Sequence, residues 1–139
     1  MDLNECLRKG FIKKTKVDKD LVRSLIEMSN IKEDAVKTAK INKSNISAYV
    51  SLAYDSLREV LESLCILNGY KVISHICMGE LLKNIIKDFE YEEFDRLRWT
   101  RNSINYYGNK IEFEQGKEII NKIFNIKKKV FDSYIKKEV

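Results

Sequence analysis

The 139-residue sequence contains no proline and only 5 glycines. Proline and glycine mark loops and tight turns, so their scarcity excludes a loop-rich fold or a β fold with many turns. The sequence also lacks any run of about 18 apolar residues, and its N-terminus lacks the apolar core of a signal peptide. We therefore expect a cytoplasmic protein that does not associate with a membrane.

Side chains for metal or covalent chemistry are also scarce. The sequence has one histidine, His75, and three cysteines, Cys6, Cys65 and Cys77, none of them in a CxxC or other metal-ligand spacing. We therefore predict reduced, buried thiols and no metal site. Glycine-rich phosphate loops and the G-x-S-x-G turn of hydrolases are absent, so no cofactor is predicted. His75 lies on a predicted apolar face and is more simply interpreted as a neutral core residue than as a catalyst.

Amphipathic periodicity runs through most of the chain. Apolar residues recur at helical spacing over residues 18–40, 45–68, 72–87, 91–107 and 114–137. Asp18 is placed to cap the first of these helices, and Gly69 and Gly108 to end the second and the fourth. Short connections between long helices favour antiparallel neighbours. The predicted fold class is all-α, an up-and-down bundle of four or five helices over residues 17–139, preceded by a basic N-terminal arm (1–16) with a short helix.

Two of these helices have faces that can be assigned from their pattern. In the helix over 18–40, the stripe predicted to face the core consists of Leu21, Leu25, Met28, Ala35 and Ala39. The helix over 45–68 has an apolar face wide enough to touch at least two neighbours. Its opposite face carries charged side chains: Asp55, Arg58 and Glu62.

The net charge is +5, and basic residues gather toward both ends of the chain. Residues 8–19 contain six lysines and arginines, and Lys127, Lys128 and Lys129 precede Lys136 and Lys137 near the other end. Solvated surface is one explanation of these clusters, and an electrostatic potential that attracts phosphate-bearing partners is the other. The charge permits a nucleic acid partner without requiring one.

An arginine stands where the helix over 91–107 should be apolar. At about 100° per residue, one face of this helix collects the following residues: Phe94, Leu97, Arg101, Ile104 and Gly108. Because a buried charge needs a partner, Arg101 either pairs with a carboxylate on a facing helix or binds an anion such as a phosphate or nucleotide. Asn102 and Asn105 add amide groups beside it. The predicted ligand-binding residues are Arg101, Asn102, Asn105 and Tyr107.

The same helix has a second, aromatic face. Tyr91, Asp95, Trp99, Asn102 and Tyr106 lie roughly opposite Leu97. Exposed aromatic side chains are typical of interfaces, which predicts a homodimer that forms through Tyr91, Trp99 and Tyr106. The alternative is that another part of the same chain covers this face.

Three stretches resemble the HEPN superfamily of small helical-bundle proteins. Residues 53–64 (AYDSLREVLESL) are similar to the family's second helix, and residues 68–75 (NGYKVISH) to the junction into its third. Arg101-Asn102 followed by Tyr106-Tyr107-Gly108 is similar to the family's C-terminal motif, an arginine and a polar residue followed by a histidine. The resemblance covers residues 18–137.

The resemblance implies metal-independent RNA cleavage in a dimer whose arginine and histidine sites meet in a cleft. In such a site the arginine stabilises the phosphorane and the histidine moves the proton of the 2′-hydroxyl. Arg101 matches the arginine, whereas Tyr106 stands at the position of the histidine. By the same resemblance, a nucleotidyltransferase-type antitoxin is an expected protein partner.

Three functional hypotheses follow. The first is a non-catalytic or weakly catalytic HEPN-like module that binds RNA or a nucleotide, as part of a toxin–antitoxin or defence pair. The second is a ribonuclease toxin that uses Arg101 with Tyr106 or Tyr107 in place of the histidine. The third is a structural or interaction bundle in which Arg101 forms an internal ion pair.

Overall fold

The computed structural model describes residues 1–139 and confirms the predicted all-α fold class. Four long helices form the body of the molecule: α2 (Lys19–Thr38), α3 (Ile46–Leu67), α5 (Tyr91–Tyr107) and α6 (Phe113–Val130). The shorter elements are α1 (Leu3–Arg8), β1 (Ile12–Lys14), β2 (Tyr70–Val72) and α4 (His75–Ile85). The chain ends in one π-helical turn, Phe131–Ile135, and one 3-10 turn, Lys136–Glu138. None of the helices combines the length and the apolarity needed to span a membrane.

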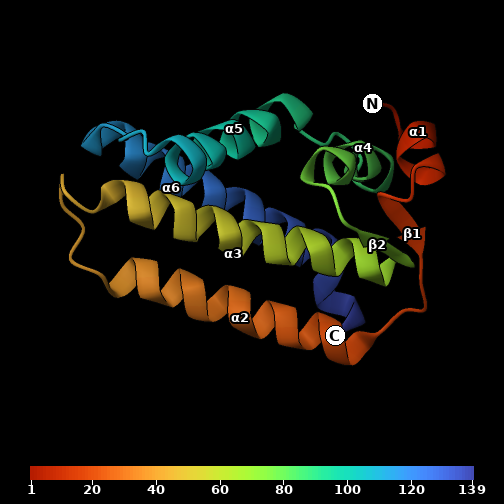
Figure 1. Ribbon diagram of the computed structural model, residues 1–139. Coiled ribbons are helices and arrows are strands. Elements are labelled where there is room, and N and C mark those ends of the chain that lie inside the picture. Colours follow the sequence, from red (N-terminus) through yellow and green to blue (C-terminus); the bar gives the residue numbers. More distant parts are fainter.

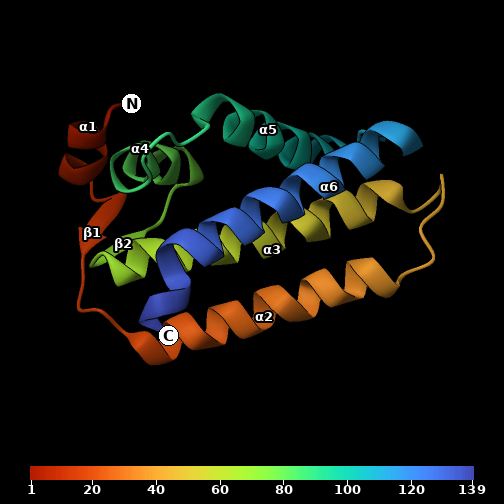
Figure 2. The same cartoon turned by 180° about the vertical axis from the view of Figure 1, so that it is seen from behind.

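Helix α3 lies at the centre of the bundle. Helix α2 packs along one side of it, α6 along another, and α5 crosses above it (Figures 1 and 2). Of its 22 residues 13 are buried, which agrees with the wide apolar face predicted from the sequence. The four long helices alternate in direction, as predicted for an up-and-down bundle (Figure 1).

The N-terminal segment is joined to the bundle rather than extended from it. Strand β1 pairs antiparallel with β2, and Ile12 lies opposite Val72. Helix α4 therefore begins at His75 and not near residue 72, because residues 70–72 form a strand whose partner lies far away in the sequence. A disulfide between Cys6 of α1 and Cys77 of α4 links the N-terminal segment covalently to the bundle. The prediction of three reduced thiols is thus wrong for this pair, and only Cys65 is a free, buried cysteine.

The predicted core stripe of α2 is wrong at Leu21, Met28 and Ala35, whereas Leu25 packs against the core as predicted. The residues that α2 buries are Val22, Ile26, Ser29 and Val36, whereas Leu21, Met28 and Ala35 are exposed. The hydroxyl of Ser29 explains part of this orientation, because it lies 2.6 Å from the carbonyl oxygen of Ser56 and 3.1 Å from its hydroxyl on α3. A polar but fully paired contact therefore stands where the sequence pattern placed Leu21 and Met28.

One lysine of the C-terminal basic cluster is part of the core. Lys127 is 5% exposed, and its ammonium lies 2.7 Å from a carboxylate oxygen of Glu33 and 3.1 Å from the amide oxygen of Asn30. Burial alone would raise the pKa of Glu33, but Lys127 and Lys37 outweigh that effect and hold the pKa below its ordinary value. The buried ammonium of Lys127 thus has its partners on α2 and links α6 to that helix. It is not part of the exposed basic surface.

We expect the disulfide to contribute strongly to stability, because it closes a sequence separation of 71 residues. Loop-closure entropy for a loop of that length corresponds to about 4 kcal/mol. Addition of a reductant should therefore lower the urea midpoint of the wild-type chain. The Cys6→Ala/Cys77→Ala variant should be less stable and insensitive to reductant. A Cys65→Ala variant that lost the reductant effect would contradict the assigned pairing.

Candidate functional site

Helix α5 lies antiparallel along α3 and brings polar residues of the two helices together. Phe94 and Leu97 of α5 are buried, as predicted. Further along, a guanidinium nitrogen of Arg101 lies 3.4 Å from a carboxylate oxygen of Asp55. One turn on, the hydroxyl of Ser51 donates to the amide oxygen of Asn105 at 2.9 Å. These two contacts fix the register of the helices and place Arg101 in their seam.

Three arginines gather in this seam, and we call Arg58, Arg98 and Arg101 the arginine cluster. Arg58 Nε lies 4.0 Å from the Asp55 carboxylate that also pairs with Arg101. Arg98 makes two hydrogen bonds to Asp95, the shorter at 2.8 Å, within its own helix. All three side chains are less than a quarter exposed. Asp55, predicted on the face opposite the core, is instead covered by α5, and its carboxylate lies beside the guanidinium groups of both Arg101 and Arg58.

The arginine cluster has more donors than the protein satisfies. Each guanidinium carries five N–H groups, yet the three side chains make five hydrogen bonds in all. Only four buried side-chain polar atoms of the whole chain lack a hydrogen-bond partner, and three of them lie in this region: Arg58 Nε, Arg101 Nε and the hydroxyl of Tyr54. The fourth, Glu59 Oε1, lies 2.9 Å from the ammonium of Lys32. Unsatisfied donors are thus concentrated at one place.

The rings of Tyr54 and His75 lie beside the arginine cluster. The Arg101 guanidinium lies 5.9 Å from the centre of the Tyr54 ring, which is itself 6.4 Å from the His75 ring. Burial raises the pKa of Tyr54 to about 12, although the three arginines act in the opposite direction. Burial and the charges of Arg58, Arg101 and Arg98 lower the pKa of His75 to about 4. Both rings are therefore neutral near pH 7. The charged groups of the site are the three guanidinium groups and the carboxylates of Asp55, Glu62 and Asp95 that pair with them.

The residues predicted from the sequence occupy two different surfaces. Asn102 accepts a hydrogen bond from Arg101 at 3.4 Å, and Asn105 lies in the same seam. Trp99, Tyr106 and Tyr107 are 60%, 68% and 73% exposed, and no other part of the chain covers them. Arg101 and Tyr106 lie about 140° apart around the helix. Tyr106 therefore points away from the seam that holds Arg101.

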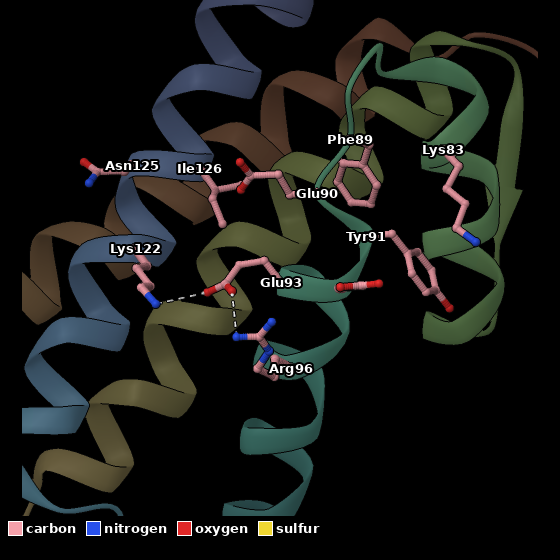
Figure 3. A pocket seen from close by; sticks show the side chains of 10 residues that line it. Lys83, Phe89, Glu90, Tyr91, Glu93, Arg96, Lys122, Asn125 and Ile126 are labelled. Atoms are coloured by element: carbon pink, nitrogen blue, oxygen red, sulfur yellow. Dashed lines mark ion pairs between the residues drawn. The ribbon is translucent and has the colours of Figure 1, made fainter.

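Tyr91 lies apart from these aromatic residues, at the mouth of an open pocket of about 830 Å³ between the start of α5 and α6. Its ring fills the space beside Gly79, where a Cβ would collide with it, and the ammonium of Lys83 lies 3.8 Å from the ring centre. In the same pocket, Glu93 pairs with both Arg96 and Lys122 at 3.5 Å (Figure 3). None of the residues that line this pocket has a buried donor without a partner, which makes the pocket a weaker candidate for an anion than the arginine cluster.

Sequence reasoning found Arg101 but not its surroundings. The sequence places nothing beside His75, because the rest of α4 and the loop after it separate this residue from Arg101 in α5. The β1–β2 pairing and the disulfide hold the start of α4 so that the His75 ring lies near the Tyr54 ring. One signal was available for the arginines. Arg98 and Arg101 stand three residues apart on one side of their helix, beside the buried stripe.

Comparison with protein-family models, curated proteins and solved structures found no match to this chain. The candidate site therefore rests on the geometry described above.

The environment of His75 can be tested directly, because it is the only histidine. Its imidazole signals in an NMR titration should report a pKa near 4, and Arg101→Gln or Arg58→Gln should raise that pKa toward the ordinary 6.5. Because the folded-state pKa is the lower one, the contribution of His75 to stability is present above pH 6.5 and is lost as the pH falls through 4. Arg23→Gln, on the exposed side of α2, is the control and should change nothing.

Proposed function

We propose that this chain is a HEPN-like RNA- or nucleotide-binding module that holds a phosphate group at the arginine cluster. The unpartnered donors of Arg58, Arg101 and Tyr54 carry this proposal. A phosphate oxygen accepts several hydrogen bonds at once, and guanidinium groups bind it with a planar fork of donors. A buried donor without a partner costs about 1–3 kcal/mol, so a ligand that satisfies these donors would recover that free energy.

The proposal favours binding over catalysis. A proton-transfer group works best with a pKa near the working pH, and the pKa of His75 lies at about 4. Tyr106 and Tyr107, the replacements for the family's histidine, are exposed on the other side of α5. A ribonuclease toxin with Arg101 and one of these tyrosines remains the second candidate. It would require a second copy of the chain to bring the two groups together.

Removal of the Arg101 fork should weaken phosphate binding. A lost charge-assisted hydrogen bond is worth about 1.5–3 kcal/mol, so Arg101→Gln should reduce affinity for ATP or for a short uridine oligonucleotide about tenfold or more. Arg101→Lys keeps the charge but not the fork and should also bind weakly. Fluorescence anisotropy with labelled RNA and calorimetry with ATP measure the two ligands separately. Arg96→Gln is the matched control, because Arg96 lies on the same helix with its side chain 71% exposed.

Tyr54→Phe separates a ligand site from a structural ion pair. The variant removes a buried hydroxyl that has no partner, so the free protein should become no less stable while phosphate binding weakens.

Three other outcomes would favour different readings. If Arg101→Gln and Arg96→Gln lost the same amount of phosphate affinity, the binding would be unspecific electrostatic attraction. A large loss of stability in Arg101→Gln, with no ligand bound by the wild type, would favour the structural bundle. Toxicity on expression in bacteria that Arg101→Gln abolishes would favour the ribonuclease.

The exposed aromatic residues support the dimeric part of the proposal. Trp99 and Tyr106 stand seven residues apart, hence on the same side of α5, and both are more than half exposed. The nucleotidyltransferase-type partner implied by the family resemblance is part of the same proposal.

Trp99→Lys should convert a dimer into monomers, because it places a charge in the centre of the proposed contact. Sedimentation velocity over a range of concentrations measures the change. Ile73→Lys, which alters another exposed apolar side chain (60% exposed), is the control. A wild-type chain that sediments as a monomer at all concentrations would contradict the proposed dimer.

A further inference from the structure

Helix α2 has a second apolar face that the bundle does not use. Leu21, Met28 and Ile31 are 45%, 45% and 53% exposed, although they belong to the largest side chains of the helix. With the exposed Ser24 and Ala35 they form a row, residues 21, 24, 28, 31 and 35, which we call the α2 seam. The spacing alternates between three and four residues, as it does at the contact positions of a coiled coil. The face that packs on α3 lies on the other side of the helix and is centred on Val22, Ile26 and Ser29.

An acidic row runs beside the α2 seam. Asp20, Glu27 and Asp34 stand seven residues apart, and all three are exposed. Asp20 pairs with Arg23 of the same helix, but Glu27 and Asp34 have no ion-pair partner within the chain. In coiled coils, charges at these flanking positions choose the partner and its orientation. The acidic row therefore selects a partner with basic flanks.

The surface beside the seam is hollowed. Glu27, Ile31 and Asp34 contribute to the wall of one open groove of about 450 Å³. Leu21 contributes to the wall of another, of about 300 Å³, near the start of the helix. Leu21 and Ile31, ten residues apart along the seam, thus each border a groove, which suits an elongated partner.

The charges argue against a second copy of the chain as this partner. Two antiparallel copies of α2 would place the acidic rows against each other. Two parallel copies would place Glu27 opposite Lys32, whose ammonium is already paired with the buried carboxylate of Glu59 at 2.9 Å. Neither arrangement gives Asp34 a cation. A helix of another protein, with an apolar heptad seam and lysine or arginine flanks, satisfies both features.

We propose that the solvent face of α2 docks such a basic amphipathic helix of a partner protein. The partner's apolar positions cover Leu21, Met28 and Ile31, and its cations pair with Glu27 and Asp34. This docking is independent of the phosphate site, because the α2 seam and the arginine cluster lie on different helices. In Figure 1, α2 forms the lower edge of the molecule, whereas α5 lies above α3.

A pair of designed peptides tests the proposal on the intact chain. Both have three heptads with leucine at the seam positions, and they carry either lysine or glutamate at the flanks. The wild-type chain should bind the lysine peptide about tenfold more tightly than the glutamate peptide at low salt, and the difference should shrink as salt is added. Glu27→Lys/Asp34→Lys should reverse this preference. Met28→Glu should abolish binding of the lysine peptide, whereas Ile73→Glu, outside the seam, should leave it unchanged.

Several results would overturn the proposal. Equal binding of the two peptides by the wild type, or no binding of either, would remove the acidic row as a determinant. Persistence of binding in Met28→Glu would place the contact elsewhere. Self-association of the wild-type chain that Met28→Glu abolishes and Trp99→Lys does not would assign the α2 seam to a second copy instead.

Discussion

The burial of most of α3 is the constraint on which the other contacts depend. A helix packed by α2, α5 and α6 cannot keep all its polar side chains in water, so several of them pair with neighbouring helices. The hydroxyl of Ser56 bonds to that of Ser29, Glu59 forms an ion pair with Lys32, and Asp55 forms one with Arg101. These pairs set the rotation of α2 and the register of α5. The helix that supplies most of the core therefore also decides which side chains reach the surface.

The candidate site is a direct consequence of that constraint. Arg101 pairs with Asp55, Arg58 lies closest to Glu62 of its own helix, and Arg98 pairs with Asp95 in its own helix. These pairs still leave Arg58 Nε and Arg101 Nε without a hydrogen-bond acceptor, and the hydroxyl of Tyr54 has no partner. Burial, together with the charges of the three arginines, lowers the pKa of His75 and keeps its imidazole neutral. Such an arrangement costs stability in the free protein, which is typical of sites prepared for a ligand.

The two surfaces of α2 show how a polar contact can override an apolar pattern. The sequence contains two apolar stripes on this helix, and the one with the larger side chains was the natural choice for the core. The bundle instead buries the stripe that contains Ser29, whose hydroxyl bonds to Ser56 and whose carbonyl oxygen accepts from Lys127. The hydrogen bonds of a buried network are satisfied only in one rotation of the helix, so they fix its orientation. The other stripe, with Leu21, Met28 and Ile31, is exposed.

The sequence by itself determined what is local. Helical periodicity, the cap at Asp18 and the stop at Gly108 were enough to predict the all-α fold and the bounds of α5, because these depend on neighbours a few residues away. The out-of-place Arg101 was also visible as a break in an apolar pattern. Tertiary structure alone decided the β1–β2 pairing, the Cys6–Cys77 disulfide, the burial of Lys127 and the approach of His75 to the arginines. Each of these joins residues far apart in the chain, and their energies depend on which helices meet, which no single helix encodes.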